Sequence, residues 1–193
     1  MAAGTPRPGG GAGQRRVIGG QWRSRRFGFP DAEGLRPTPD RVRETLFNWL
    51  APWLPGARVL DLFTGSGALY LEALSRGAGQ ALALDLNPQA ISSLRQHLQA
   101  LQCPHGQLLQ SDALAWLEQA PASPFDLVFL DPPFGRGLLQ PCCQQLESRG
   151  WLAGRAWIYT ESETAPSGLG LPAHWRLHRE KPAGQVPPSL THT

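Results

Sequence analysis

Residues 131–134 are Asp131, Pro132, Pro133 and Phe134, and they follow a run of mostly apolar residues at 125–130. The run predicts a buried strand, which ends at the prolines because neither can donate a ladder hydrogen bond. Open α/β sheets bind ligands beyond the carboxyl ends of their strands. There, a carboxylate and a carbonyl would accept hydrogen bonds from an amino group, and an aromatic ring would cover a flat base. We interpret these residues as a base-binding site, the alternative being a tight turn with a buried Phe134.

A glycine-rich turn with a preceding acid follows the apolar segment that starts at residue 58. These residues are Asp61, Thr64, Gly65, Ser66 and Gly67. Glycines allow a ligand to approach the backbone, and the acid accepts hydrogen bonds from a cationic or amide donor. The third glycine of the dinucleotide fingerprint is replaced by Tyr70, which disfavours a nicotinamide oxidoreductase. S-adenosylmethionine carries an ammonium group and no phosphate, so it suits the turn better, although a Gly-x-Gly alone also fits a simple tight connection.

Two further acids end predicted strands. Asp85 lies about twenty residues after the glycine turn, where a carboxylate commonly binds ribose hydroxyls. Asp112 is placed either to meet the exocyclic amine of adenine or to cap the helix that follows. With Asp61 and Asp131, acids thus end four successive strands. A parallel sheet brings all four ends to one edge, so we predict a site there for S-adenosylmethionine beside the target base.

Strands and helices alternate from residue 58 onward. We predict strands at 58–63, 80–84, 106–110, 125–130, 156–160 and 175–179, and helices at 68–76, 88–101, 113–120 and 138–148. This alternation indicates a doubly wound, Rossmann-like α/β sheet in which most strands are parallel. The segment 184–190 contains adjacent prolines, which would confine it to a sheet edge.

Three regions are expected along the chain: a disordered tail at 1–14, a basic hairpin and helix extension at 15–57, and the α/β core at 58–193. The tail is rich in glycine, proline and alanine and has little to bury. Segments 16–22 and 25–29 predict a β-hairpin carrying Trp22, for which packing is favoured over a nucleic-acid contact. Thr38 is the expected N-cap of the helix that follows.

Positive charge is concentrated at the start of the chain. Residues 1–43 hold nine arginines and three acids, whereas the remaining residues hold nine bases and twelve acids. A basic front on a mildly acidic body indicates a polyanionic partner, and we predict RNA. For several of these arginines the alternative is simple solvation. The arginines proposed to contact the RNA backbone are Arg15, Arg16, Arg23, Arg25, Arg26, Arg36, Arg41 and Arg43.

Length and composition point to one globular domain with extensions. The chain has 193 residues, of which 41% are hydrophobic, and it contains no run long enough to span a membrane. We therefore expect a soluble, cytoplasmic protein. Its three cysteines lack metal-ligand spacing, so we interpret them as reduced thiols and expect no metal site.

Several motifs together resemble the RsmD family of 16S ribosomal RNA guanine-N2 methyltransferases, which are class I enzymes dependent on S-adenosylmethionine. The matching segments are 18–22, 34–47, 65–67, 111–113 and 131–134, within a resemblance that runs from about residue 17 to residue 186. Glu161 and Lys181 also fit the family's later strands. The resemblance implies a class I methyltransferase sheet that is mostly parallel, with an antiparallel edge at its C-terminal end.

The resemblance also implies roles for residues. S-adenosylmethionine would contact Asp61, Thr64, Gly65, Ser66, Gly67, Asp85 and Asp112, and the target base would contact Asp131, Pro132 and Phe134. The target would be the N2 amine of the guanine at position 966 of 16S rRNA, within the assembled small subunit, and we expect a monomer. Thr64 and Tyr70 depart from the family pattern and are expected to narrow the cofactor pocket, whereas Pro187 and Pro188 interrupt the last strand.

Two alternatives stay open at this point. Methyltransferases of adenine N6 in nucleic acids and of glutamine N5 in proteins have similar Pro-Pro-aromatic loops, although the basic front argues against a protein substrate. A ribosome-assembly factor that binds RNA without catalysis is disfavoured, because the four acids and the glycine turn are all present.

Overall fold

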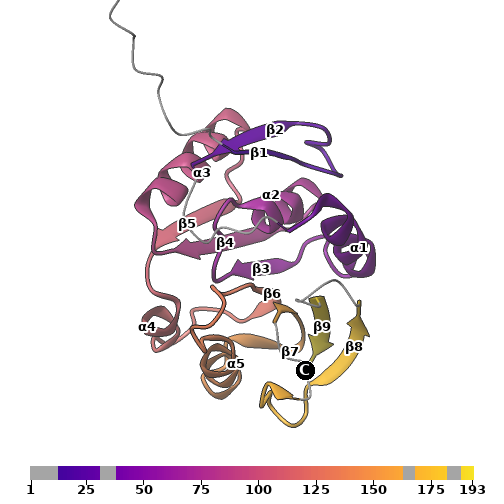
Figure 1. Cartoon of the computed structure of the whole chain (residues 1–193), viewed down its shortest axis with the longest axis vertical. Helices are drawn as coiled ribbons and strands as arrows, with labels where there is room; N and C mark the ends of the chain where they lie inside the picture. Colours follow the sequence, from indigo (N-terminus) through magenta and orange to yellow (C-terminus); the bar gives the residue numbers. More distant parts are fainter. Residues whose placement is uncertain (1–12, 31–37, 163–167, 182–187) are drawn as a thin grey trace, which may run out of the picture.

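The computed structural model describes residues 13–30, 38–162, 168–181 and 188–193. A seven-stranded sheet with the order β5-β4-β3-β6-β7-β9-β8 forms its centre (Figure 1). The strands of this sheet are β3 (Arg58–Asp61), β4 (Gln80–Asp85), β5 (Gly106–Gln110), β6 (Phe125–Leu130), β7 (Leu152–Glu161), β8 (Arg176–Glu180) and β9 (Pro188–His192). The five strands β3 to β7 all run parallel to one another. Strand β9 pairs with β7 and β8 in the antiparallel direction. The doubly wound, mostly parallel sheet is therefore confirmed.

Helices cover both faces of the sheet and give the molecule two apolar cores. They are α1 (Asp40–Leu50), α2 (Ala68–Ser75), α3 (Pro88–Ala100), α4 (Ala113–Leu117) and α5 (Leu139–Ser148). One core contains buried apolar residues of α1, α2 and α3, and the other contains those of α4 and α5. Since strands that are buried on both faces are mostly apolar, this arrangement explains why β6 is apolar at every position except Asp126 near its start.

The end of the chain differs from its prediction. Strand β9 begins at Pro188 and lies inside the sheet, between β7 and β8, rather than at an edge. A proline is tolerated as the first residue of a strand, and the Pro188 carbonyl still accepts a hydrogen bond from the Lys181 amide at 3.2 Å. Leu190 is fully buried, which accounts for the interior position of the strand. Pro187 lies outside the described residues.

The N-terminal hairpin consists of the antiparallel strands β1 (Gly13–Arg16) and β2 (Arg26–Phe29). The prediction that the first strand continues to Trp22 is wrong, because the chain turns onto α2 instead. Gly20 has a φ of +78°, and a Cβ there would lie 1.9 Å from the Ser75 carbonyl oxygen, so only glycine permits this approach. Gly13 and residue 14 belong to β1 rather than to a disordered tail, and residues 1–12 lie outside the described part of the chain.

Trp22 is buried, 7% exposed, and its backbone amide donates to the Ser75 Oγ at 2.9 Å. It belongs to the same apolar core as Val17 and Phe27 of the hairpin and the buried residues of α2. The packing interpretation of Trp22 is thereby supported, and the basic extension shares its core with the sheet.

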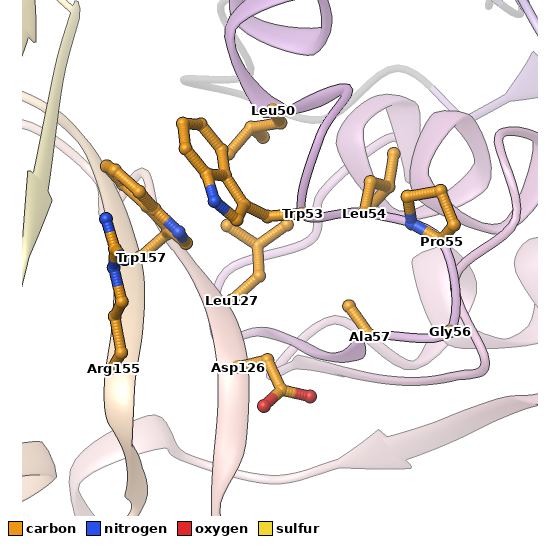
Figure 2. Close-up of a pocket in the computed structure, with 10 residues that line it drawn as sticks. All are labelled: Leu50, Trp53, Leu54, Pro55, Gly56, Ala57, Asp126, Leu127, Arg155 and Trp157. Carbon is orange, nitrogen blue, oxygen red and sulfur yellow. The ribbon is translucent and has the colours of Figure 1, made fainter.

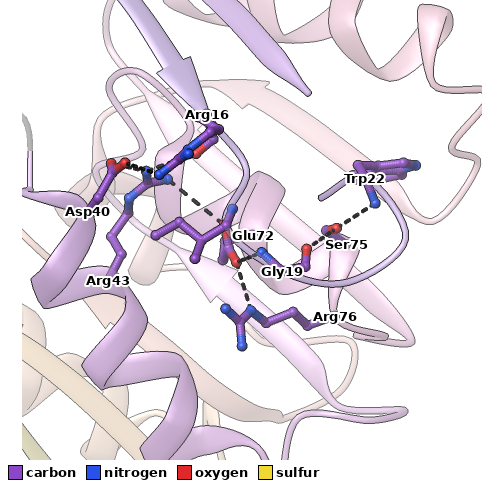
Figure 3. Close-up of polar contacts among 9 residues, drawn as sticks. Arg16, Gly19, Trp22, Asp40, Arg43, Glu72, Ser75 and Arg76 are labelled. Atoms are coloured by element: carbon purple, nitrogen blue, oxygen red, sulfur yellow. Dashed lines mark hydrogen bonds and ion pairs between the residues drawn. The ribbon is translucent and has the colours of Figure 1, made fainter. Parts of the chain in front are cut away.

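A fully buried carboxylate, Glu72 of α2, joins this extension to the sheet (Figure 3). Its oxygens accept hydrogen bonds from the amides of Ile18 and Gly19, both at 2.8 Å, and from the Arg76 Nε at 2.7 Å. The guanidinium of Arg43 lies 3.9 Å away. A buried charge is tolerated when it is paired and hydrogen-bonded in this way. Glu72 therefore attaches the hairpin to the helix that begins at the glycine turn.

Arg43 is not available to RNA, contrary to its prediction. Its side chain is only 1% exposed, and it donates to Asp40 at 2.6 Å and to the Arg16 carbonyl at 2.9 Å. The physical reason is helical spacing, since residues three and four positions further on, Leu46 and Phe47, form the buried face of α1. Arg43 is thus a structural cation that pairs with acids.

Thr38 does not cap α1, again contrary to its prediction. The helix begins after Pro39 without a side-chain cap, and the Thr38 hydroxyl donates to the Glu161 Oε1 at 3.0 Å. Thr38 thereby connects the start of α1 with the end of β7.

The described helices include none that is long and apolar enough to cross a membrane. The three cysteines are free, and burial raises the pKa of the Cys142 thiol to about 12.

Replacement of Glu72 tests whether it holds the extension in place. Glu72→Gln keeps the shape of the side chain but removes the charge that pairs with Arg76 and, beside Asp40, with the buried Arg43. We expect a loss of about 3 kcal/mol in the free energy of unfolding, measured by urea denaturation. The exposed Glu44→Gln on α1 is the control and should change this free energy by less than about 0.5 kcal/mol. Equal effects of the two substitutions would contradict the assignment.

Candidate functional site

Acidic residues gather at the carboxyl edge of the parallel strands, as predicted. Asp61 and Asp85 are the last residues of β3 and β4, Asp131 directly follows β6, and Glu161 ends β7. In the register of β6 and β7, Leu130 pairs with Thr160. Asp131 and Glu161 are therefore side by side at strand ends that are about 5 Å apart. The four acids therefore lie at the ends of four adjacent strands, in the order β4, β3, β6 and β7.

The glycine turn between β3 and α2 is fixed by Asp85. One oxygen of this carboxylate accepts from the Gly65 amide and the other from the Asn87 amide, each at 2.8 Å. Gly65 and Gly67 both have positive φ, and a Cβ on Gly67 would lie 2.1 Å from the Leu94 side chain. These two glycines are therefore required by the conformation of the turn itself. Asp85 holds the turn beside the next strand, and its ribose contact stays a prediction.

Asp61 is almost completely buried, 2% exposed, at the base of this turn. Burial raises its pKa to about 7, an effect strengthened by Asp85 and opposed by the nearby Thr64 hydroxyl and by the Phe63 amide. The Thr64 hydroxyl is buried beside Asp61 and makes no hydrogen bond of good geometry. An unsatisfied hydroxyl next to a buried acid provides polar atoms that a ligand can use.

Asp131 has an unusual electrostatic environment. Burial raises its pKa well above the ordinary value, and the charges of Glu161 and Asp61 raise it further. Within the described residues, no hydrogen bond to its carboxyl group opposes this shift. A partly buried carboxyl group beside two other acids is costly for the protein alone and is suited to a ligand that brings N–H groups.

Glu161 is a site residue that reasoning from single residues did not select. Its Oε1 accepts hydrogen bonds from the Tyr159 hydroxyl at 2.8 Å and from Thr38 at 3.0 Å. Burial raises the pKa of this carboxyl, and the two hydroxyls act in the opposite direction. The signal in the sequence was present, since Glu161 is a fifth acid that ends a predicted strand.

The remaining predicted site residues are divided between the site and other roles. Pro132 is buried, Phe134 is half-buried, and the chain turns away at Gly135, which has a φ of +70°. Asp112 is the N-cap of α4, where it accepts from the Ala115 amide at 2.9 Å, so the capping alternative is correct and an adenine contact stays a prediction. Tyr70, expected to narrow the cofactor pocket, is instead buried in the core and donates to the Gln107 carbonyl.

The predicted RNA-binding arginines also separate into groups. Those that are exposed are Arg23, Arg25, Arg26 and Arg41. Arg16 is exposed and forms an ion pair of 3.3 Å with Asp40. Arg15 is half-buried over the Phe29 ring, and burial lowers its pKa. Arg36 lies outside the described residues, and Arg43 is buried.

A cavity of about 300 Å³ lies at the opposite ends of the strands, near the starts of β3 and β6 (Figure 2). Its wall includes Trp53 and Trp157, whose rings are 4.0 Å apart, together with Asp126 and Arg155. None of the predicted cofactor-binding or base-binding residues lines this cavity. The predicted chemistry therefore belongs to the acidic edge and not to this cavity.

The raised pKa of Asp61 predicts how stability depends on pH. Between about pH 4 and about pH 7 the folded chain keeps a proton on Asp61 that the unfolded chain releases, so the free energy of unfolding falls as the pH rises. The fall contributed by Asp61 is at most about 4 kcal/mol, since one pKa unit corresponds to about 1.4 kcal/mol. In urea denaturation across this range, Asp61→Asn should show a flatter decline than the unmodified protein. Parallel declines would contradict the buried, protonated state of Asp61.

Comparison with known proteins assigns the chain to a family. Residues 15–191 match the family described as "Conserved hypothetical protein 95". The chain is 51% identical over 176 residues to "Ribosomal RNA small subunit methyltransferase D" of Escherichia coli K12, covering 91% of this chain and 88% of the relative. It is 42% identical to the protein of the same name from Haemophilus influenzae, covering 90% and 91%.

Solved structures agree with this assignment. "Putative methyltransferase yhhF" of E. coli superposes with a TM-score of 0.85 at 48% identity, covering 93% of this chain and 98% of that one. A putative methyltransferase solved in complex with SAH shares the fold, with a TM-score of 0.67 at 15% identity over 87% of this chain and 53% of that one. The chain therefore belongs to the RsmD family of S-adenosylmethionine-dependent ribosomal RNA methyltransferases.

Proposed function

We propose that this protein transfers a methyl group from S-adenosylmethionine to the exocyclic N2 amine of a guanine in 16S rRNA. The observation that carries the proposal is the Asp131 carboxyl group, which is partly buried and lies beside two other acids that raise its pKa. Guanine N2 carries N–H groups that can donate to this carboxyl. Membership in the RsmD family supports the same substrate.

The cofactor would be held at the turn between β3 and α2. The buried acid Asp61 and the unsatisfied Thr64 hydroxyl fit a ligand that carries positive charge and amino hydrogens. We assign the other contacts to Gly65, Ser66 and Gly67 of the turn, to Asp85 at the end of β4 and to Asp112 before α4. When bound, S-adenosylmethionine supplies a methyl group that its sulfonium sulfur already activates.

The task of the protein is mainly to position the amine. The guanine amine is a poor nucleophile because its lone pair is delocalised into the ring, so in-line placement has a large effect on rate. The Asp131 carboxylate and the Pro132 carbonyl accept the amine hydrogens, which orients the lone pair and stabilises the positive charge that develops on nitrogen. Phe134 stacks on the base, a contact worth ~1–3 kcal/mol in single-strand binders.

The basic extension would bind the RNA backbone. Arg23 and Arg25 in the hairpin turn, Arg26 on β2 and Arg41 on α1 are exposed, and Arg16 is accessible beside Asp40. Arg36 belongs to the same proposal. The target guanine must be unpaired or flipped out, because its amine is otherwise part of a base pair.

The finer identity of the substrate rests on the family. We propose guanine 966 of 16S rRNA in the assembled small subunit as the target, and a monomer in the cytoplasm as the active form. The small-subunit relatives of similar length support this choice.

The reaction is tested by incubating the protein with labelled S-adenosylmethionine and small ribosomal subunits that lack the modification. Mass spectrometry of the digested nucleosides should find N2-methylguanosine, and mapping should place it at the expected position. N6-methyladenosine would replace the proposed target by adenine. The absence of any labelled nucleoside, from subunits and naked rRNA alike, would favour a non-catalytic assembly factor.

Replacement of Asp131 tests its role directly. Asp131→Ala should abolish measurable turnover, because the amine loses its acceptor, while the Kd for S-adenosylmethionine changes little. Asp126→Asn is the matched control, since Asp126 is an acid at the other end of the same strand, where it accepts from the Arg58 amide. That variant should retain turnover. An active Asp131→Ala enzyme would contradict the assignment.

The proposed role of the exposed arginines predicts a change in salt dependence. Arg25→Ala should weaken binding to small subunits and reduce the slope of log Kd against log salt concentration by about 0.7–0.9 for each phosphate that is no longer neutralised. Arg176→Ala, an exposed arginine on β8, is the control and should leave the slope unchanged. Identical slopes for both variants and the unmodified protein would exclude Arg25 from the RNA interface.

A further inference from the structure

We propose that Glu161 is a positioning residue for the methyl transfer. Its negative charge beside Asp131 favours the transfer of the leaving proton from the guanine amine to the Asp131 carboxylate. The inference rests on the proposed function and adds to it a second carboxylate, with its own hydrogen-bond partners.

The position of Glu161 is set by the sheet. Leu130 of β6 pairs with Thr160 of β7 in parallel register, so the next residues, Asp131 and Glu161, emerge side by side at the carboxyl edge. Leu130 and Thr160 are both fully buried, which leaves the two strand ends little freedom to separate. The juxtaposition of the two carboxyl groups is thus a consequence of the fold.

Two hydroxyl groups orient the Glu161 carboxylate. Tyr159 and Thr38 both donate to the same oxygen, Oε1, at 2.8 and 3.0 Å. Two donors on one oxygen favour the ionised form of this carboxyl and fix its plane.

Among the described residues, few groups surround the pair. The groups next to Asp131 and Glu161 are Asp61 at the end of β3, Tyr159 on β7 and Thr38 before α1. The charge on Glu161 raises the pKa of Asp131, after the larger effect of burial, and Asp61 adds to it. A raised pKa means that Asp131 is a stronger proton acceptor once it is ionised. Glu161 therefore acts on the reaction through Asp131.

The balance of the step follows from these positions. The lone pair of guanine N2 forms the new N–C bond, the C–S bond breaks, and its electron pair stays on sulfur as the thioether. The nitrogen then carries one proton too many, and this proton passes to the Asp131 carboxylate. Ionised Glu161 stabilises the protonated Asp131 that results.

Thr38 gives this pair a connection to the rest of the protein. It lies in the segment between β2 and α1, two residues before the helix begins, so its hydrogen bond to Glu161 connects the end of β7 with the basic extension. A single side chain thus contacts the positioning residue and belongs to the part of the chain that we assign to RNA binding.

The test compares Glu161→Gln with the unmodified protein in the same assay, over a range of pH. Glutamine keeps an oxygen acceptor for both hydroxyls and removes the charge. We call the low-pH part of the profile, where kcat rises with pH, the acid limb. At pH above this limb we expect kcat of Glu161→Gln to be lower by ~10-fold or more, in the range of general-base effects. The KM for small subunits and the Kd for S-adenosylmethionine should be nearly unchanged. The acid limb of the profile should move to lower pH, because Asp131 loses the neighbouring charge that raises its pKa.

Two further variants make the result specific. Glu161→Asp retains the charge, so its acid limb should stay close to that of the unmodified protein even though kcat falls. Glu118→Gln removes an exposed acid far from this edge and should change neither kcat nor the limb. If Glu161→Gln does not fold, Thr38→Val replaces it: loss of one donor favours protonated Glu161, and the limb should shift in the same direction to a smaller extent.

The proposal is overturned if the acid limb of Glu161→Gln stays at the pH of the unmodified protein, or if that of Thr38→Val does so where this variant replaces it. It is also overturned if the limb of Glu161→Asp moves as far as that of Glu161→Gln. Failure of the proposed function would be seen separately, as the absence of N2-methylguanosine with the unmodified protein. A purely structural role for Glu161 would lower stability and kcat without moving the limb.

Discussion

The concentration of buried and partly buried carboxyl groups at one edge of a parallel sheet is the constraint on which the site depends. Asp61, Asp131 and Glu161 end three neighbouring strands, and burial raises the pKa of each. Like charges held close together and shielded from water are unfavourable for the isolated protein. A ligand that is cationic and rich in N–H donors relieves this cost, which is why the edge suits a sulfonium cofactor next to a guanine amine.

A second buried acid shows the contrast between structure and function. Glu72 is as deeply buried as any group at the site, yet amides and guanidinium groups of the fold satisfy it completely, and it joins the basic extension to α2. Within the described residues, no hydrogen bond opposes the rise in the pKa of Asp131. The difference between a satisfied carboxylate and one whose pKa is raised by neighbouring acids separates the residue that holds the fold together from the one that we assign to the substrate.

Much of this arrangement could be predicted from the sequence, because apolar strands and the acids that end them are local patterns. The position of Asp131 after β6 and the bounds of β5 and β6 follow from such patterns. The burial of Arg43 could not be predicted in this way, because an arginine is ordinarily exposed. Its buried partner Glu72 lies far away in the sequence, and only the fold brings the two together. Strand β9 was misjudged for a related reason: its interior position depends on pairing with β7 and β8, and not on Pro188 itself.

The most direct test of the central claim is a crystal structure of the protein with S-adenosylhomocysteine and a short RNA that contains the target guanine. Our account predicts that guanine N2 lies about 3 Å from both the Asp131 carboxylate and the Pro132 carbonyl, with Phe134 stacked on the base. A guanine whose N2 points away from Asp131, or a base bound at the cavity near Trp53 and Trp157 instead, would contradict it.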